Sequence, residues 1–369
     1  MRTYDIAAYI WPSYHPDPRA RQFWPAGFGE WETVMKHPPL YDGKTPRHPL
    51  WGYINESDPR VMEMQIDAAA DHGVNVFIYD WYWYDRRPFL ERCLNDGFLG
   101  ARNNERMSFY LMWANHNANL LWDHRLAHQS PENVWLGSVP RGEFEIIGRR
   151  LIDKYFSHPR YYRIDGKPAF MIYDLETLMT GLGGLENTRA ALDWLRREVL
   201  QAGLGGLHLQ YALREHPRYI LKLESGEVIG SQKEVVETLG FDSLTHYQYC
   251  HFARMNQSYN DVMTAVHAQW NRVSQDFTIP YYAHVSIGWD PNPRFQSMAL
   301  DYVTGNTPAA FESALRAAKE YTDARADKQR RLITVNSWNE WTETSYLQPD
   351  TLFQYQYLEA VKRAFPPST

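Results

Sequence analysis

The sequence predicts an α/β protein, a single (β/α)8 TIM barrel in which long βα loops form the active-site face. Eight short runs rich in β-branched and aromatic residues are bounded by Gly, Pro, Asp or Asn, a pattern typical of β-strands. A stretch with helical periodicity follows nearly every run, which favours parallel βαβ units. Such a barrel needs roughly 250 residues, so the chain of 369 residues has roughly 120 to spare. These surplus residues fall after the ends of the predicted strands.

The strands are expected where apolar runs stand between turn residues, and the helices where apolar residues recur three and four positions apart, as in Leu192, Leu195 and Val199. Glycines such as Gly203 are expected to end helices. The predicted strands are residues 4–10, 74–81, 107–114, 168–174, 207–213, 242–249, 280–287 and 331–338. The predicted helices are residues 60–72, 88–99, 142–156, 187–202, 233–239, 258–275, 308–325 and 353–364.

A doubly wound open sheet is the alternative fold. It would need a Gly-rich phosphate turn after a strand, but the GLGGL runs at 181–185 and 203–207 do not complete the G-x-G-x-x-G pattern. No internal repeat, low-complexity tract or linker divides the chain, so residues 1–369 are expected to form one catalytic domain. The surplus residues are expected to build the active face of the barrel, in the loops 11–59, 115–141, 214–232 and 288–307.

Composition limits the possible partners. With 38 Lys and Arg against 44 Asp and Glu, the net charge of −6 offers no basic excess for a phosphate backbone, so nucleic acid is not expected as a partner. No apolar run reaches the roughly 18 residues of a membrane span. The start of the chain lacks the apolar region of a signal peptide, so a cytoplasmic location is expected, or a periplasmic or secreted one if a leader has been removed. Cys93 and Cys250 alone do not make a disulfide framework.

The end of the last predicted strand carries the first candidate catalytic residue. Barrel active sites lie at the carboxyl ends of the strands, and here the chain reads NSWNEWTE from Asn336 to Glu343. Side chains alternate along a strand, so Asn336, Trp338 and, if the strand persists, Glu340 are expected to face the barrel interior. Glu343 joins Glu340 if the chain turns between them, because residues three apart approach within about 5–6 Å in a helical turn. Two carboxylates in one cleft suit the chemistry of glycosidic bonds, with one giving and one taking a proton. The alternative is two solvated loop glutamates.

The other strand ends repeat one chemistry of aromatic faces beside Asp, Asn, His and Arg, which fits a polyhydroxylated ligand such as an oligo- or polysaccharide. Glu30 in the first loop either contacts substrate or caps local structure. The candidate substrate-binding residues are Glu30, Trp31, Asp80, Trp81, Trp83, Trp113, Asn115, His116, Tyr173, Asp174, His246, Tyr247, Trp289, Asp290, Arg294, Trp338, Asn339 and Trp341.

Neither a metal nor a cofactor is expected. His15, His37 and His48 lie near one another in the sequence, but no H-E-x-x-H run or paired Cys spacing accompanies them. A serine nucleophile would need a G-x-S-x-G elbow, which is missing.

At these residues the chain resembles the glycoside hydrolase family 99-like proteins, including the group labelled WbsX, whose members are often described as glycosyltransferases of polysaccharide loci. The most specific segment is Asn336 to Glu343, and the resemblance extends over most of the chain. It also covers Gly27 to Trp31, Phe77 to Tyr84, Trp113 to Asn115, and Trp289-Asp290 with Arg294.

The resemblance implies a (β/α)8 barrel and a catalytic pair. In family 99 endo-α-mannosidases the two glutamates of an N-E-W-x-E run do the chemistry, and they match Glu340 and Glu343. The first deprotonates the 2-hydroxyl of the sugar, which attacks C1 to form a 1,2-anhydro sugar. The second is the general acid and then the general base. The chain departs from the WbsX-like pattern at Thr344, where Gly is usual, and at Gln348, where the L-E-P-D run has Glu.

The function expected from these residues is that of a retaining glycoside hydrolase. Its substrate would be a 1,2-trans α-linked glycan, with α-mannosides and α-L-rhamnosides as the leading candidates. The alternatives are a glycosyltransferase of polysaccharide biosynthesis and a non-catalytic carbohydrate-binding homologue. A transferase that uses a nucleotide sugar would be expected to show a nucleotide-binding fold or a D-x-D metal motif, and neither is found.

Overall fold

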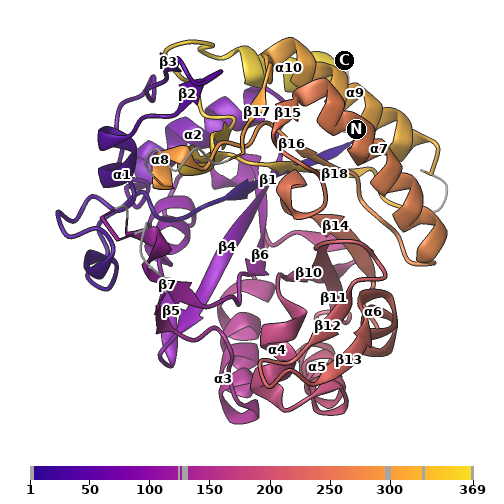
Figure 1. The fold of residues 1–369 in the computed structure, drawn as a ribbon. Helices are drawn as coiled ribbons and strands as arrows, with labels where there is room; N and C mark the ends of the chain where they lie inside the picture. Colours follow the sequence, from indigo (N-terminus) through magenta and orange to yellow (C-terminus); the bar gives the residue numbers. More distant parts are fainter. Residues whose placement is uncertain (1–3, 124, 127–131, 296–300, 326–328, 367–369) are drawn as a thin grey trace.

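The computed structural model describes residues 4–123, 125–126, 132–295, 301–325 and 329–366 (Figure 1). Eight parallel strands lie in the order β14-β11-β10-β6-β4-β1-β18-β16 and curve into a barrel. Each coincides with a predicted strand, so the predicted (β/α)8 architecture is confirmed. The barrel strands are β1 (Asp5–Ile10), β4 (Val76–Tyr84), β6 (Ser108–Trp113), β10 (Lys167–Ile172), β11 (His208–Leu213), β14 (Ser243–His246), β16 (His284–Ser286) and β18 (Leu332–Asn336).

The barrel closes at a seam between β14 and β16. Here the residues that the structure describes form only a short parallel bridge between Leu244 and Tyr281. The amide of Leu244 donates to the carbonyl of Pro280 at 2.9 Å, and the amide of Tyr282 donates to the carbonyl of Leu244 at 2.8 Å. By contrast, β4 and β6 pair continuously along residues 76–81 and 108–113. The seam is therefore held by fewer backbone hydrogen bonds than the neighbouring strand pairs.

Helices cover the outside of the barrel. Local signals start several of them: Asp58 accepts a hydrogen bond from the amide of Arg60 at the start of α2, and Ser231 and Glu234 form a capping box on α6. The covering helices are α2 (Pro59–Asp71), α3 (Arg141–Leu151), α4 (Leu175–Leu182), α5 (Leu185–Gln201), α6 (Gln232–Leu239), α7 (Tyr259–Asp276), α9 (Pro308–Asp323) and α10 (Gln356–Ala364). The π-helical segment η5 (Ile152–Phe156) extends α3.

The predicted helix 88–99 forms only in part. Strand β4 continues to Tyr84, and β5 (Arg87–Phe89) folds back against it as an antiparallel hairpin. Asp85 and Arg86 take positive φ angles of 53° and 61° at the turn, as a tight hairpin requires. Only the π-helical segment η2 (Cys93–Phe98) follows.

Short elements build the long loops. In the first loop these are η1 (Ala20–Gln22), α1 (Trp31–Lys36), β2 (Leu40–Tyr41) and β3 (Thr45–Pro46). Later loops hold η3 (Asn104–Arg106), β7 (Ala118–Asn119), η4 (Leu120–Trp122), β8 (Asn133–Trp135), β9 (Arg163–Ile164), β12 (Ile220–Lys222), β13 (Val228–Ser231), η6 (Tyr249–His251), β15 (Gln257–Ser258), α8 (Asn292–Phe295) and β17 (Val303–Thr304). After β18 come β19 (Asn339–Glu340), η7 (Trp341–Glu343) and β20 (Ser345–Tyr346).

The barrel interior is packed, and several of its buried polar groups are paired. Thr334 Oγ1 lies 2.6 Å from Thr245 Oγ1 and 3.0 Å from His284 Nδ1, and Tyr110 donates to Gln210 at 2.9 Å. Such pairing is what buried polar groups require. Thr334 thus faces inward from β18, as the alternation of the strand predicts.

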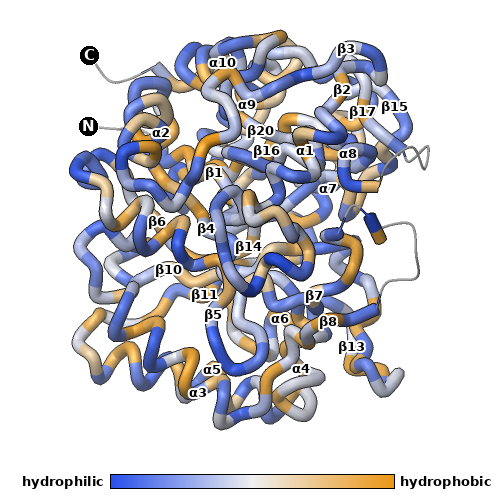
Figure 2. Tube along the Cα trace, turned by 90° about the vertical axis from the view of Figure 1, so that its left-hand side faces the viewer, coloured by the Kyte–Doolittle hydropathy of each residue, from blue (hydrophilic) through white to orange (hydrophobic). Residues whose placement is uncertain are grey.

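The loops that follow the strands gather on one face, which is turned toward the viewer in Figure 1. In Figure 2 this face lies on the right, with α1, α8, β7, β8 and β13. The described part of the chain holds no helix with the length and apolar composition needed to span a membrane.

Candidate active site

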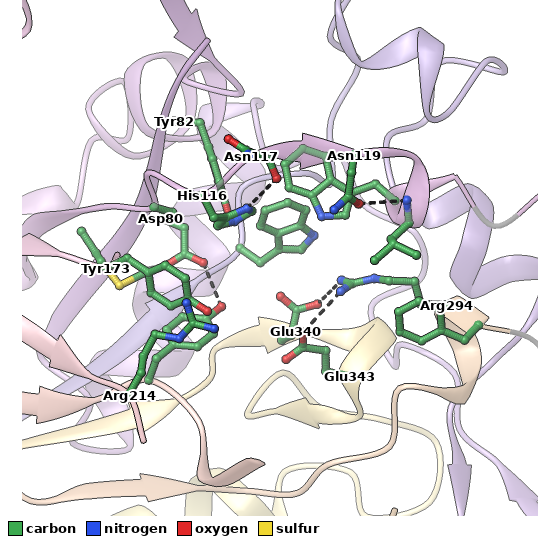
Figure 3. Close-up of a pocket in the computed structure, with 17 residues that line it drawn as sticks. Asp80, Tyr82, His116, Asn117, Asn119, Tyr173, Arg214, Arg294, Glu340 and Glu343 are labelled. Atoms are coloured by element: carbon green, nitrogen blue, oxygen red, sulfur yellow. Dashed lines mark hydrogen bonds and ion pairs between the residues drawn. The ribbon is translucent and has the colours of Figure 1, made fainter. Parts of the chain in front are cut away.

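A cavity, here called the cleft, opens at the loop face (Figure 3). Seven of the residues predicted for the site line it: Asp80, His116, Tyr173, Tyr247, Arg294, Glu340 and Glu343. They come from strand ends and loops far apart in the sequence, as the barrel topology predicts.

Glu340 and Glu343 lie together at the floor of the cleft because β19 leads directly into the 3-10 turn η7. One guanidinium binds both side chains. Arg294 on α8 places Nη2 3.2 Å from Glu340 Oε1 and Nη1 3.3 Å from Glu343 Oε1. The turn brings the two carboxyl groups onto a single counter-ion.

Glu30 binds the same guanidinium from behind, with Oε1 3.3 Å from Arg294 Nη2. The indole of Trp11 donates to Glu30 Oε2, and Arg294 also donates to Thr342 Oγ1 at 2.7 Å. Glu30 is fully buried and does not line the cleft. It therefore holds Arg294 in place instead of facing a ligand.

Three carboxyl groups around one cation leave an excess of negative charge in a buried place. Burial, and then the charge of Glu343, raise the pKa of Glu340 well above its ordinary value, although Arg294 opposes the shift. Burial also raises the pKa of Glu343, again against Arg294. Raised pKa values in a coupled pair allow one carboxyl group to hold a proton while the other is ionised, as acid–base catalysis requires. Among the described residues, no donor lies within hydrogen-bond distance of Glu343 Oε2.

Besides Glu340 and Glu343, a third carboxyl group lines the cleft. It belongs to Asp80, which lies across the cleft from the pair. Its Oδ2 accepts a hydrogen bond of 2.9 Å from the hydroxyl of Tyr247, and its buried Oδ1 has no donor among the described residues. Burial raises the pKa of Asp80 well above its ordinary value, although the Tyr247 hydrogen bond opposes this shift. A buried acceptor without a donor is a natural partner for a ligand hydroxyl.

Arg214 forms one end of the cleft, opposite Arg294. Its Nη1 lies 2.8 Å from Asp174 Oδ2, and its guanidinium lies 5.1 Å from the ring centroid of Tyr173. Asn115 binds the backbone of Asp174 on both sides, donating to its carbonyl at 2.7 Å and accepting from its amide at 2.9 Å. Neither Asn115 nor Asp174 lines the cleft. They fix the residues that do.

His116 and Tyr82 form another part of the wall, with ring centroids 5.7 Å apart in an edge-on arrangement. Burial lowers the pKa of His116, so its imidazole is neutral near neutral pH. Its Nδ1 lies 3.0 Å from the carbonyl of Asn117.

Three predicted tryptophans point away from the cleft, and their assignment to the site is corrected here. Trp81 donates from Nε1 to Glu91 at 2.8 Å, and Trp83 donates to Glu143 on α3 at 2.7 Å. Trp113 packs against Phe144 of α3. The reason is strand alternation, because Asp80 and Tyr82 line the cleft from β4, and Met112 and Ala114, the neighbours of Trp113, line it from β6 and the residue that follows.

The residues that flank Glu340 also lie outside the cleft. Trp338 was expected to face the barrel interior, but β18 ends at Asn336 and the alternation stops there. Three buried polar residues receive the side chains that flank Glu340: Gln65 accepts from Trp338 Nε1 at 2.5 Å, Glu56 accepts from Asn339 Nδ2 at 2.9 Å, and Gln348 accepts from Trp341 Nε1 at 2.7 Å.

These three acceptors are joined to one another. Gln348 Nε2 donates to Glu56 Oε1 at 2.8 Å and to Gln65 Oε1 at 2.9 Å. We call Glu56, Gln65 and Gln348 the anchor network. Asn339 further exchanges two hydrogen bonds of 2.9 Å with the backbone of Trp11. The motif around Glu340 is therefore built to hold the loop and not to touch a ligand.

The other predicted site residues also have positions outside the cleft. His246 lies 2.7 Å from the hydroxyl of Tyr281, and burial lowers the pKa of His246 to about 3. Trp31 donates to the carbonyl of Ile54 at 2.7 Å, and Trp289 is partly buried against the core. Asp290 starts α8 by accepting from the amide of Asn292 at 3.0 Å, and its own amide donates to the carbonyl of Glu343 at 2.8 Å.

Several residues that line the cleft are absent from the prediction. Tyr82 was detectable, since it shares the inward face of β4 with Asp80, two positions away. Arg214 was detectable as well, because it directly follows the predicted strand 207–213. The residues of the β7–η4 segment lie in a loop without a pattern that points to a ligand. The unpredicted lining residues are Trp11, Tyr82, Met112, Ala114, Asn117, Asn119, Leu121, Trp122, Arg214 and Phe295.

No group of three or more His, Cys, Asp or Glu side chains within the described ranges has the arrangement of a metal site. His15 lies buried, and burial lowers its pKa to about 4.

A family model described as Glycosyltransferase WbsX matches residues 6–361. Among curated proteins, the chain is 25% identical over 374 residues to the "Uncharacterized protein WxcX" of Xanthomonas campestris pv. campestris strain B100, covering 97% of this chain and 49% of the relative. The protein of the same name from strain ATCC 33913 matches equally. The chain thus spans about half the length of the curated relatives it matches.

Two solved structures share the fold over the chain. A "Glycoside hydrolase-like protein" superposes with a TM-score of 0.62 at 14% identity, covering 100% of this chain and 95% of the other. The GH99 endo-alpha-mannosidase of Bacteroides thetaiotaomicron superposes with a TM-score of 0.57 at 14% identity, covering 98% and 95%. Likeness at this identity establishes the barrel architecture alone.

Proposed function

The chain belongs to the WbsX family, and from this membership and the geometry of the cleft we propose that it is a retaining glycoside hydrolase. The observation that carries the proposal is the placement of Glu340 and Glu343 on one guanidinium at the carboxyl end of the barrel strands. Two carboxyl groups in a cleft, one protonated and one ionised, are the equipment for cleaving a glycosidic bond.

Both glutamates receive the guanidinium of Arg294, and Glu340 Oε1 also receives the hydroxyl of Thr342 at 3.1 Å. Burial raises the pKa values of both carboxyl groups, which allows the pair to share one proton. We assign the base to Glu340 and the acid to Glu343 from their order in the N-E-W-x-E run that the chain shares with family 99 endo-α-mannosidases. Glu343 Oε2, which is buried and has no donor among the described residues, is the oxygen proposed to carry the proton.

In the first proposed step, Glu343 gives its proton to the glycosidic oxygen and the bond from C1 to that oxygen breaks. Glu340 takes the proton of the 2-hydroxyl, and O2 bonds to C1 to form a 1,2-anhydro sugar. In the second step, water gives a proton to Glu343 and attacks C1, the C1–O2 bond breaks, and Glu340 returns its proton to O2. Two inversions at C1 give net retention.

This mechanism selects the substrate. O2 must approach C1 from the face opposite the leaving group, so the substituents at C1 and C2 must be trans. α-Mannosides and α-L-rhamnosides meet this condition, whereas α-glucosides and α-galactosides do not. The aromatic rings of the cleft, with Tyr82 and Trp122 5.8 Å apart, provide apolar surface for the C–H faces of a sugar, and Asp80 provides an acceptor for a hydroxyl.

The description of the family as a glycosyltransferase favours a second candidate function. In that case the acceptor would be a sugar hydroxyl and the donor a nucleotide sugar. A third possibility is sugar binding without turnover.

One experiment separates these functions. The protein is incubated with α-mannosides and α-L-rhamnosides, with and without nucleotide-sugar donors, and NMR follows the anomer formed first. We expect hydrolysis that needs no donor and a product of retained configuration. The 2-deoxy analogue of the substrate should not turn over. An inverted product, or ready cleavage of the 2-deoxy analogue, would exclude the 2-hydroxyl mechanism. Product formed only in the presence of a nucleotide-sugar donor would establish the transferase. Binding of a glycan without formation of any product would establish sugar binding without turnover.

A further inference from the structure

A second cavity, here called the distal pocket, borders the cleft. The two cavities share Arg214, whose side chain is 37% exposed and so is open to ligands. The walls of the distal pocket come from the start of α4, the end of β11 and the segment that leads into β12. None of these elements carries the acid pair, so the distal pocket lies beyond the end of the cleft marked by Arg214.

The lining of the distal pocket has the chemistry that recognises a sugar. Tyr219 is 45% exposed and lines the pocket, so it offers an aromatic face at the surface. Glu176 and Glu215 offer carboxylate oxygens, and Leu221 supplies an apolar base. Sugar hydroxyls donate well to carboxylates, while the C–H face of the ring packs on an aromatic side chain.

The hairpin β12–β13 fixes this lining. Glu176 Oε1 accepts a hydrogen bond of 2.7 Å from the amide of Lys222, which ties α4 to the hairpin. On the other side, Tyr211 donates to Gln232 at 2.7 Å, so the floor of the pocket is already paired. The exposed groups left for a ligand are those of Arg214, Glu215 and Tyr219.

We infer that the distal pocket binds a further neutral sugar residue of the same glycan, which runs from Glu343 past Tyr173 and Arg214 onto Tyr219. The inference rests on the proposed function, since the cleft must hold the sugar that is cleaved. It makes the substrate an oligosaccharide or polysaccharide, with Arg214 donating to hydroxyls on both sides of the boundary.

The test compares chain lengths. α-Manno-oligosaccharides and α-L-rhamno-oligosaccharides of two to five residues are assayed with the wild type, with Tyr219→Ala and with Val228→Ala. Val228 is 61% exposed on the same hairpin but does not line the pocket, which makes it the matched control. The quantity measured is the ratio of kcat/KM for the longest substrate to that for the shortest.

We expect the wild type and Val228→Ala to prefer the longest substrate, and Tyr219→Ala to lower the ratio about tenfold, equivalent to about 1.4 kcal/mol. Unchanged thermal unfolding of the variant ensures that the loss reflects binding. The inference would be overturned if kcat/KM of the wild type did not depend on the length of the oligosaccharide. It would also be overturned if Tyr219→Ala left the ratio unchanged.

Calorimetry with Glu343→Gln separates this inference from the proposed function. If a glycan binds about tenfold more weakly to the double variant Glu343→Gln, Tyr219→Ala than to Glu343→Gln, this result supports sugar binding in the distal pocket even if the wild type cleaves nothing. Absence of binding for every length, or affinity that does not depend on Tyr219, overturns it even if hydrolysis is observed.

Discussion

Asn339, the residue before Glu340, donates a hydrogen bond of 2.9 Å from Nδ2 to the buried Oε2 of Glu56. This contact ties the loop that carries the acid pair to the segment before α2, on the outside of the barrel. Because Asn339 also clamps the backbone of Trp11 at the end of β1, the position of Glu340 is fixed from two sides. Catalytic groups need this support, since small displacements cost much of the rate.

Replacing either glutamate by its amide tests the proposed roles. Glu340→Gln and Glu343→Gln should each lower kcat by about 10²–10⁴-fold with the fold retained, because an amide cannot exchange protons. An aryl leaving group should partly restore Glu343→Gln but not Glu340→Gln, since a good leaving group needs no acid. Steady-state kinetics on aryl and alkyl glycosides measure both effects. Near-normal turnover of either variant on an alkyl glycoside would refute its assignment.

Removing the shared cation should move the pH profile. Arg294 lowers the pKa values of Glu340 and Glu343 against the effect of burial. In Arg294→Met both pKa values rise, so ionisation of the base requires a higher pH, and the acidic limb of kcat/KM should move up by about one unit or more. Arg214→Met, which removes the cleft arginine that pairs with Asp174, is the control and should leave the limb in place. An unmoved limb in Arg294→Met would contradict the electrostatic role.

The buried Glu56 should make stability depend on pH. Burial raises its pKa from 4.5 to about 7, with hydrogen bonds from Gln348 and Asn339 opposing the shift. Above pH 4.5 the unfolded state ionises first, so this group destabilises the folded protein increasingly until the pH passes about 7. The free energy of unfolding of the wild type relative to Glu56→Gln should therefore fall by about 2–3 kcal/mol between about pH 5 and pH 8.

Urea denaturation of both proteins across this range measures the difference. A difference that stays constant with pH would mean that Glu56 keeps its charge in the fold. Gln65→Ala, which removes a hydrogen bond that lowers the pKa of Glu56, should raise that pKa further and so enlarge the loss of stability between about pH 5 and pH 8.

Treatment with a chelator should leave activity unchanged. The three carboxyl groups nearest the proposed reaction centre surround Arg294, whose positive charge occupies the place that a cation would need. Assays after dialysis against EDTA, with and without added divalent ions, provide the check. Loss of activity that one ion restores would assign a metal to the reaction and favour the transferase.

The barrel could be predicted from sequence because its strands are short apolar runs between turn residues, and such runs alternate with helical periodicity along the chain. Glu340 and Glu343 could be placed by the rule that barrel sites lie at strand ends. Trp81 and Trp83 were misplaced because their chemistry was weighed without the alternation that puts Asp80 and Tyr82 inside.

Trp338 was misplaced for a different reason. Its orientation depends on where β18 ends, and no local pattern marks Asn336 as the last residue of the strand. Arg214 directly follows β11, so the same rule points to it, but its contacts with Asp174 and Tyr173 could not be predicted because these residues are distant in sequence. The anchor network escaped prediction too, because only the folded barrel brings Glu56 and Gln348 together.

The seam between β14 and β16 separates the two sides of the cleft. Arg214 and Tyr247 follow β11 and β14, whereas Arg294 and Glu340 follow β16 and β18. Side chains cross the seam where the backbone pairing is short: Gln248 Nε2 donates to the carbonyl of Gly288 at 3.3 Å and to Asn336 Oδ1 at 3.0 Å, and the hydroxyl of Tyr249 donates to the carbonyl of His284 at 3.3 Å. The spacing of the two sides of the cleft therefore depends on these side chains and not on a continuous ladder of backbone hydrogen bonds.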